Sequence, residues 1–74
     1  DKNSIKVYPN PVSDILTVQT HEVISEVNLF NLVGQKIDIS WQNNQLDMTS
    51  LAKGNYILII NIDGISRNIK ITKQ

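Results

Sequence analysis

The segment LAKGNYILIINIDGISRNIKI, residues 51–71, decides which fold this chain can adopt. Its centre is the run YILIINI, residues 56–62, which is rich in β-branched isoleucine. Such residues favour the pleated surface of a strand. Apolar side chains in this run fall on both faces, which is typical of a strand that is covered on both sides. We therefore predict that residues 56–62 form a central strand.

A tight turn follows this strand. Asp63-Gly64 is a dipeptide that accepts positive φ at both centres of a type I′ turn. The chain then returns with Ile65, Ile69 and Ile71 on one face and polar residues on the other, as in a half-exposed strand. We predict a β-hairpin over the last third of the chain, with Asp63 and Gly64 at its turn.

A glycine and a tyrosine mark the start of the hairpin. Tyr56 lies two residues after Gly54 and follows a turn-like segment, residues 50–53. This spacing matches the tyrosine corner of Greek-key sandwiches, in which the phenol hydroxyl bonds to a backbone group a few residues upstream. The alternative is a strand-initial core tyrosine without that bond. We expect the corner.

Length and composition limit the ways in which this chain can be stabilised. We expect its 74 residues to form one small domain, with residues 1–4 as a polar lead-in. The chain has no cysteine, so disulfides and thiolate metal sites are excluded. Its single histidine, His21, lacks the further ligands that zinc needs. We expect apolar burial to stabilise the fold and predict no metal or cofactor.

The charge balance excludes several classes of partner. Seven basic and seven acidic residues cancel, whereas a nucleic-acid interface needs a basic face. No run approaches the roughly 18 apolar residues of a spanning helix. We predict neither nucleic-acid binding nor membrane insertion. Because the chain starts with Asp1, we expect it to be a piece of a longer protein.

Five further strands precede the hairpin in the predicted pattern. Pro9 and Pro11 interrupt the chain after the first of them, as at a sheet edge or a bend between sheets. Gly34 is expected to take positive φ in a turn. The strands are expected at residues 5–8, 14–20, 26–32, 36–41 and 45–48. With no helix-period segment, this pattern predicts an all-β, immunoglobulin-like sandwich of about seven antiparallel strands in Greek-key order.

No set of residues in the sequence indicates catalysis. Serine, histidine and aspartate are present, but a catalytic triad is defined by geometry rather than by composition. The aspartates are scattered, one to a segment, and no calcium-binding loop pattern occurs. We predict that the chain has no catalytic residue and is not an enzyme.

Two aromatic residues leave a second function open. Trp41 continues the inward face of its strand, so we expect it in the core. Phe30 becomes a candidate contact residue if it points outward. An accessory adhesion or carbohydrate-binding sandwich is the alternative function that these two aromatics suggest.

The combination of motifs resembles the C-terminal sorting domain (type A) of the type IX secretion system of Bacteroidetes. The matching pieces are Tyr8-Pro9-Asn10-Pro11, Leu16-Thr17-Val18, residues 27–36, Leu46-Asp47-Met48, residues 51–56, Gly64 and residues 69–73. They occur in order and span nearly the whole chain. The family fold, an immunoglobulin-like sandwich, agrees with the fold predicted from the residues.

The resemblance assigns roles to particular positions. The turn glycine and the basic turn residue of the family fall on Gly34 and Lys36, and its corner residues fall on Gly54 and Tyr56. Asn31 departs from the family, which often has aspartate there, and Asn68 stands where lysine is common. The recognition residues that we predict lie in the last strand and are Arg67, Ile69, Lys70, Ile71 and Lys73. The basic members of this set have a simpler alternative, a solvated charged edge.

The resemblance also implies partners and a destination. Such domains follow an N-terminally fused cargo that passes through the periplasm and then the outer-membrane translocon, reaching the cell surface or the medium. The implied partners are the translocon, its shuttle protein and a sortase-like cysteine protease that removes the domain. We expect recognition through strand edges and the terminal hairpin rather than through a pocket.

Overall fold

The computed structural model describes residues 5–74, which contain eight β-strands and no helix. The predicted lead-in at residues 1–4 lies outside the described residues. The strands are β1 (Lys6–Tyr8), β2 (Ile15–Gln19), β3 (Glu26–Asn31), β4 (Lys36–Ile37), β5 (Ser40–Gln42), β6 (Gln45–Asp47), β7 (Gly54–Ile62) and β8 (Ile65–Lys73). No helix capable of crossing a membrane occurs among residues 5–74.

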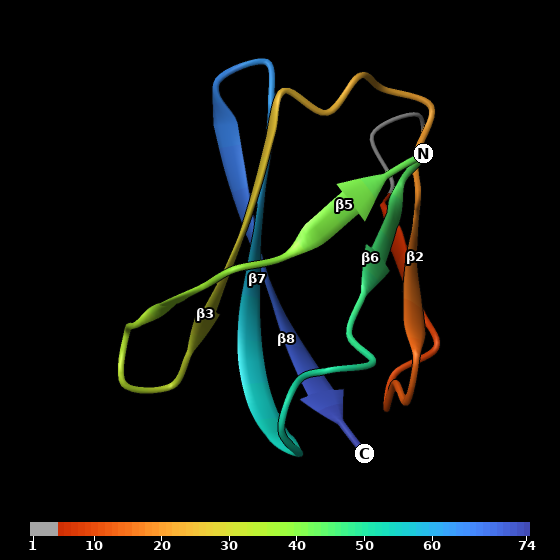
Figure 1. The fold of residues 1–74 in the computed structure, drawn as a ribbon. Coiled ribbons are helices and arrows are strands. Elements are labelled where there is room, and N and C mark those ends of the chain that lie inside the picture. The colour runs from red at the N-terminus through yellow and green to blue at the C-terminus, as the bar shows by residue number, and fades with distance from the viewer. Residues whose placement is uncertain (1–4) are drawn as a thin grey trace.

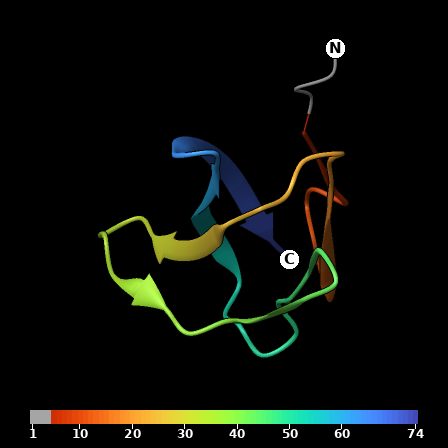
Figure 2. The same ribbon diagram turned by 90° about the horizontal axis from the view of Figure 1, so that it is seen from above.

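The strands form two antiparallel sheets of four, in the orders β1-β2-β6-β5 and β4-β3-β7-β8. Figure 1 shows the two sheets as separate layers, and Figure 2 shows the same layers from above. This arrangement confirms the predicted all-β sandwich. The immunoglobulin-like Greek-key order stays a prediction.

The central strand is β7, which lies between β3 and β8 as predicted. Its inner face buries Leu58 and Ile60 completely. On its outer face Ile57 and Ile59 are only half-buried, because no third layer of described residues covers that side. Apolar residues on both faces therefore correctly indicated a central strand, but the cover on the second face is partial.

Two-residue turns fix the register of the β7–β8 and β5–β6 hairpins. At the β7–β8 turn Asp63 has φ 53° and Gly64 has φ 77°, and Ile62 pairs with Ile65. This geometry confirms the predicted type I′ turn. The β5–β6 turn uses Asn43 and Asn44, with φ of 53° and 58°. Asparagine tolerates the left-handed region better than most residues, which explains the pair at this turn.

The segment that we predicted as one strand, residues 36–41, is two short strands in different sheets. β4 pairs with β3, whereas β5 pairs with β6. In Figure 1 the chain crosses from one layer to the other immediately before β5. Ile37, Ile39 and Trp41 all pack against the core, so the alternation of apolar residues continues through the crossing and conceals it. The sandwich accordingly has eight strands rather than seven.

Facing side chains of the two sheets form one core. Trp41 packs against it, as predicted. The buried hydrophobic residues are Val12, Leu16, Val18, Leu29, Leu46, Met48, Tyr56, Leu58, Ile60, Ile62 and Ile71. Val12 has no solvent exposure, and we did not predict its burial because it stands alone between two turn-forming residues with no alternating partner.

Candidate functional site

The terminal strand β8 is held along one edge by the side chain of Asn10. The Asn10 Nδ2 donates a hydrogen bond to the Lys70 carbonyl at 3.1 Å, and its Oδ1 accepts one from the Thr72 N–H at 3.1 Å. A side-chain amide has the donor and acceptor of a peptide group, so Asn10 takes the place of a neighbouring strand. This explains the asparagine between Pro9 and Pro11.

The backbone of Val12 continues this contact. Its N–H donates to the Thr72 carbonyl at 2.9 Å, and its carbonyl accepts the N–H of Gln74 at 2.8 Å. Val12 also forms an isolated parallel bridge with Lys73. We call Asn10 and Val12 the terminal clamp, because together they close the edge of the last residues of β8.

The first half of β8 keeps an open edge. β8 is the last strand of its sheet, so one side of it has no strand partner. Alternate residues of a strand direct their backbone groups to the same side. Because Lys70 and Thr72 direct theirs to the clamp, Ser66 and Asn68 direct theirs to the open side. The side chains of residues 65–68 are all exposed as well. We call residues 65–69 the open edge.

The five predicted recognition residues separate into two groups. Arg67 and Lys70 are exposed, whereas Ile71 is fully buried and Ile69 is half-buried. Lys73 is only 8% exposed, and its Nζ donates to the Gln74 carbonyl at 3.1 Å. The solvated charged edge, our alternative for the basic residues, is therefore wrong for Lys73. Lys73 shares the inward face of β8 with Ile71, and the alternation along the strand should have indicated its burial.

The Tyr56 hydroxyl donates a hydrogen bond to the Ala52 carbonyl at 2.7 Å. This confirms the bond that the tyrosine-corner spacing predicted. Gly54 has φ 145° at the start of β7, in the region that favours glycine. The corner fixes the connection from β6 into the central strand and so holds the β7–β8 hairpin against the other sheet.

Asn31 organises the β3–β4 turn, in which Gly34 has φ 88° as predicted. Its Oδ1 accepts hydrogen bonds from the N–H groups of Val33 at 3.1 Å and Gln35 at 2.9 Å. Its Nδ2 donates to the Gln35 Oε1 at 2.8 Å. A neutral carbonyl serves these donors as an aspartate carboxylate would, so the turn needs an acceptor at this position rather than a charge.

Phe30 points outward, because it alternates with the fully buried Leu29. It pairs with Lys36 on β4 and with Ile57 on β7. The structure thus meets the condition under which Phe30 was a candidate contact residue. Trp41 packs against the core and does not share this surface.

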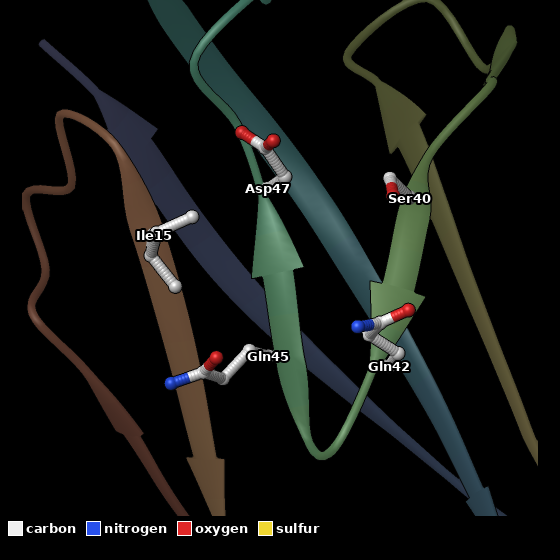
Figure 3. Close-up of a pocket in the computed structure, with 5 residues that line it drawn as sticks. All are labelled: Ile15, Ser40, Gln42, Gln45 and Asp47. Atoms are coloured by element: carbon white, nitrogen blue, oxygen red, sulfur yellow. The ribbon is translucent and has the colours of Figure 1, made fainter.

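A shallow polar hollow of about 250 Å³ lies on the other sheet. Figure 3 shows the residues that line it, with Gln45 and Asp47 of β6 between Ile15 of β2 and the pair Ser40 and Gln42 of β5. Hydrogen bonds from the Thr49 side chain and backbone N–H lower the pKa of Asp47 below its ordinary value. Within residues 5–74 no cluster of three or more histidine or acidic side chains could hold a metal ion.

One comparison with known proteins identifies the family. A family model described as a secretion system C-terminal sorting domain matches residues 6–74. Searches of curated proteins and of solved structures found no match. The matched residues include both sheets, the terminal clamp and the open edge. The chain therefore belongs to the family of C-terminal sorting domains of the type IX secretion system.

Proposed function

We propose that this domain is a non-catalytic address that directs a cargo fused to its N-terminal side across the outer membrane through the type IX translocon. The observation that carries the proposal is the family match over residues 6–74. The cargo passes through the periplasm with the domain attached and then reaches the cell surface or the medium. The domain as a whole, residues 1–74, serves as one unit in this process.

The open edge supports recognition by strand addition. Unpaired backbone groups on an edge strand can hydrogen-bond to an extended segment of another protein. At the open edge Ser66 and Asn68 supply those groups, and the exposed side chains of Arg67 and Lys70 lie beside them. The translocon and its shuttle protein are the proposed partners. The terminal clamp keeps the rest of β8 fixed, so the edge is presented in one geometry.

We further propose that a sortase-like cysteine protease removes the domain once the cargo has crossed. Cleavage before β1 would leave the folded unit largely intact, because every buried core residue and both clamp residues lie downstream of that point, and only the half-buried Ile5 packs against the core from before β1. The released domain would therefore stay folded. Mass spectrometry of the released fragment tests this step, and a first residue within or after β1 would contradict it.

Charge reversal separates recognition from folding. The double change Arg67→Glu and Lys70→Glu alters two exposed residues, so we expect a normal circular dichroism spectrum and reduced export of a fused reporter. Lys6→Glu on the other sheet is the control, since Lys6 is also exposed, and this change should leave export unchanged. Lys73→Glu should instead destabilise the fold, because it places a carboxylate at a buried position. Full export of the double variant would contradict recognition through these charges.

One observation favours the alternative, a carbohydrate-binding module. Tyr8 is 47% exposed on β1 and shares a cross-strand row with Thr17 and Gln45, beside the polar hollow. An aromatic ring next to amide groups suits a sugar face and its hydroxyls. Chemical-shift titration of the domain with a panel of polysaccharides tests this function, and an unchanged spectrum throughout would exclude it for that panel.

A further inference from the structure

One row of side chains crosses the outer face of the β4-β3-β7-β8 sheet from edge to edge. The strand register pairs Lys36 with Phe30, Phe30 with Ile57, and Ile57 with Lys70. We call these four residues the outer row. The inner face is occupied by their sequence neighbours, which are the fully buried Leu29, Leu58 and Ile71 and the half-buried Ile37, so the outer row faces away from the core.

The next row along the strands has a similar arrangement, with an isoleucine of β7 flanked by polar residues. Ile59 pairs with Asn28 on one side and with Asn68 on the other. The two rows together form an apolar centre of half-buried side chains, and lysine or asparagine flanks it on both sides. Neither row contains a carboxylate, and no described segment covers the centre. This surface is therefore complementary to an apolar group that carries negative charge on either side.

The spacing of the two lysines selects the shape of that partner. Adjacent strands lie about 4.8 Å apart, so three intervals place the Lys36 and Lys70 backbones about 14 Å apart. An extended chain advances about 3.4 Å per residue, which puts residues i and i+4 about 14 Å apart with residue i+2 midway on the same face. In an α-helix the same two residues lie only about 6 Å apart along the axis.

We propose that this sheet face docks an extended segment of the export machinery with the pattern acidic-x-apolar-x-acidic. Its two carboxylates would pair with Lys36 and Lys70, and its apolar side chain would lie on Phe30 and Ile57. The proposal rests on the proposed function and names the partner chemistry for the exposed Lys70 and for Phe30. It adds a face contact to the strand-edge contact at the open edge.

Nuclear magnetic resonance titration of the 15N-labelled chain with the blocked peptide SETLTES tests the pattern directly. We expect shift changes centred on the amides of the outer row and an affinity that falls as salt rises. The isomer SEELTTS keeps the composition but places the two acidic residues side by side, and we expect it to bind at least about fivefold more weakly, since it can engage only one lysine at a time.

A charge exchange gives the sharper test. The variant Lys36→Glu and Lys70→Glu should bind SETLTES at least about tenfold more weakly and should instead bind SKTLTKS. The variant Lys6→Glu and Lys53→Glu makes the same change in net charge at exposed residues outside the outer row and should behave as wild type. Equal binding of SETLTES and SEELTTS would overturn the proposal. So would shifts in the outer row caused only by phosphatidylglycerol vesicles, which would indicate a lipid surface.

Export assays distinguish a failure of the docking proposal from a failure of the proposed sorting function. If the domain is not an address, a reporter carrying the wild-type domain stays in the periplasm. If only the docking proposal is wrong, the reporter with the Lys36→Glu domain is exported as efficiently as wild type, because Lys36 lies on β4 and outside the open edge. The expected result is efficient export of the wild type and of the Lys53→Glu control, with a severalfold loss for Lys36→Glu.

Discussion

Replacing Asn10 by alanine removes the side-chain part of the terminal clamp. The change deletes the two hydrogen bonds to Lys70 and Thr72, each 3.1 Å long, and leaves the core untouched because Asn10 is exposed. A net hydrogen bond contributes about 0.5–1.5 kcal/mol, so we expect the loss of two to lower the free energy of unfolding by about 1–3 kcal/mol. In a domain of this size that corresponds to a fall in Tm of roughly 6–20 °C.

Urea denaturation and amide hydrogen exchange measure this effect globally and locally. The Thr72 amide should exchange faster in Asn10→Ala, because its acceptor is gone. Asn10→Asp keeps an acceptor for Thr72 but loses the donor to Lys70, so its loss of stability should be intermediate. Asn68→Ala is the matched control, since Asn68 is exposed on the same strand outside the clamp. A loss in Asn10→Ala no larger than in this control, with Thr72 still protected, would refute the clamp.

Three further predictions concern the corner, the β3–β4 turn and one carboxylate. Tyr56→Phe should lower the free energy of unfolding by about 1 kcal/mol through loss of the hydroxyl bond, whereas Tyr8→Phe should not change it; equal losses in urea melts would argue against the corner. Asn31→Ala should lower the free energy of unfolding by about 1–2 kcal/mol, and Asn31→Asp should lower it by much less because an acceptor remains. Equal losses for the two variants would show that the turn does not depend on the acceptor. The pKa of Asp47 is lowered by Thr49, so its ionised form stabilises the fold above the unfolded-state pKa. That contribution is lost as the pH falls through the lower, folded-state pKa. Asp47→Asn should therefore flatten the acid side of a plot of the urea midpoint against pH. An unchanged plot would contradict the lowered pKa.

The two halves of β8 differ in how their outer edge is covered. The terminal clamp closes the edge of the last residues, whereas the open edge has no strand partner on that side. The clamp joins the start of the domain to its end, so the last residues of β8 are held on both edges only when residues 10–12 are in place beside them. The open edge then lies on a folded platform. A partner that reads this edge would consequently accept folded domains and reject partly unfolded chains, and Asn10→Ala should reduce export as well as stability.

Local sequence signals predicted the features whose cause is local. The turn dipeptide at Asp63 fixed the β7–β8 hairpin, and the spacing of Gly54 and Tyr56 predicted the corner bond. Alternation identified most of the buried residues, including Leu16 and Leu46. In each of these cases the determining residues lie within a few positions of one another.

The features that escaped prediction depend on distant contacts or on a change of sheet. Asn10 and Thr72 are 62 positions apart, and nothing near either residue indicates the other. The crossing between β4 and β5 preserves the alternation of apolar residues, so the pattern at residues 36–41 suits one strand as well as two. Lys73 was judged by its charge, although its position in the alternation placed it inside.

The most direct test of the central claim is the localisation of a reporter that carries an N-terminal export signal and residues 1–74 at its C-terminus. It is compared in a host with the type IX machinery and in a matched host without the translocon, by protease accessibility of the reporter and by fractionation. We predict delivery to the surface or medium in the first host alone. Retention in the periplasm of both hosts would contradict the claim that this domain is a sufficient address.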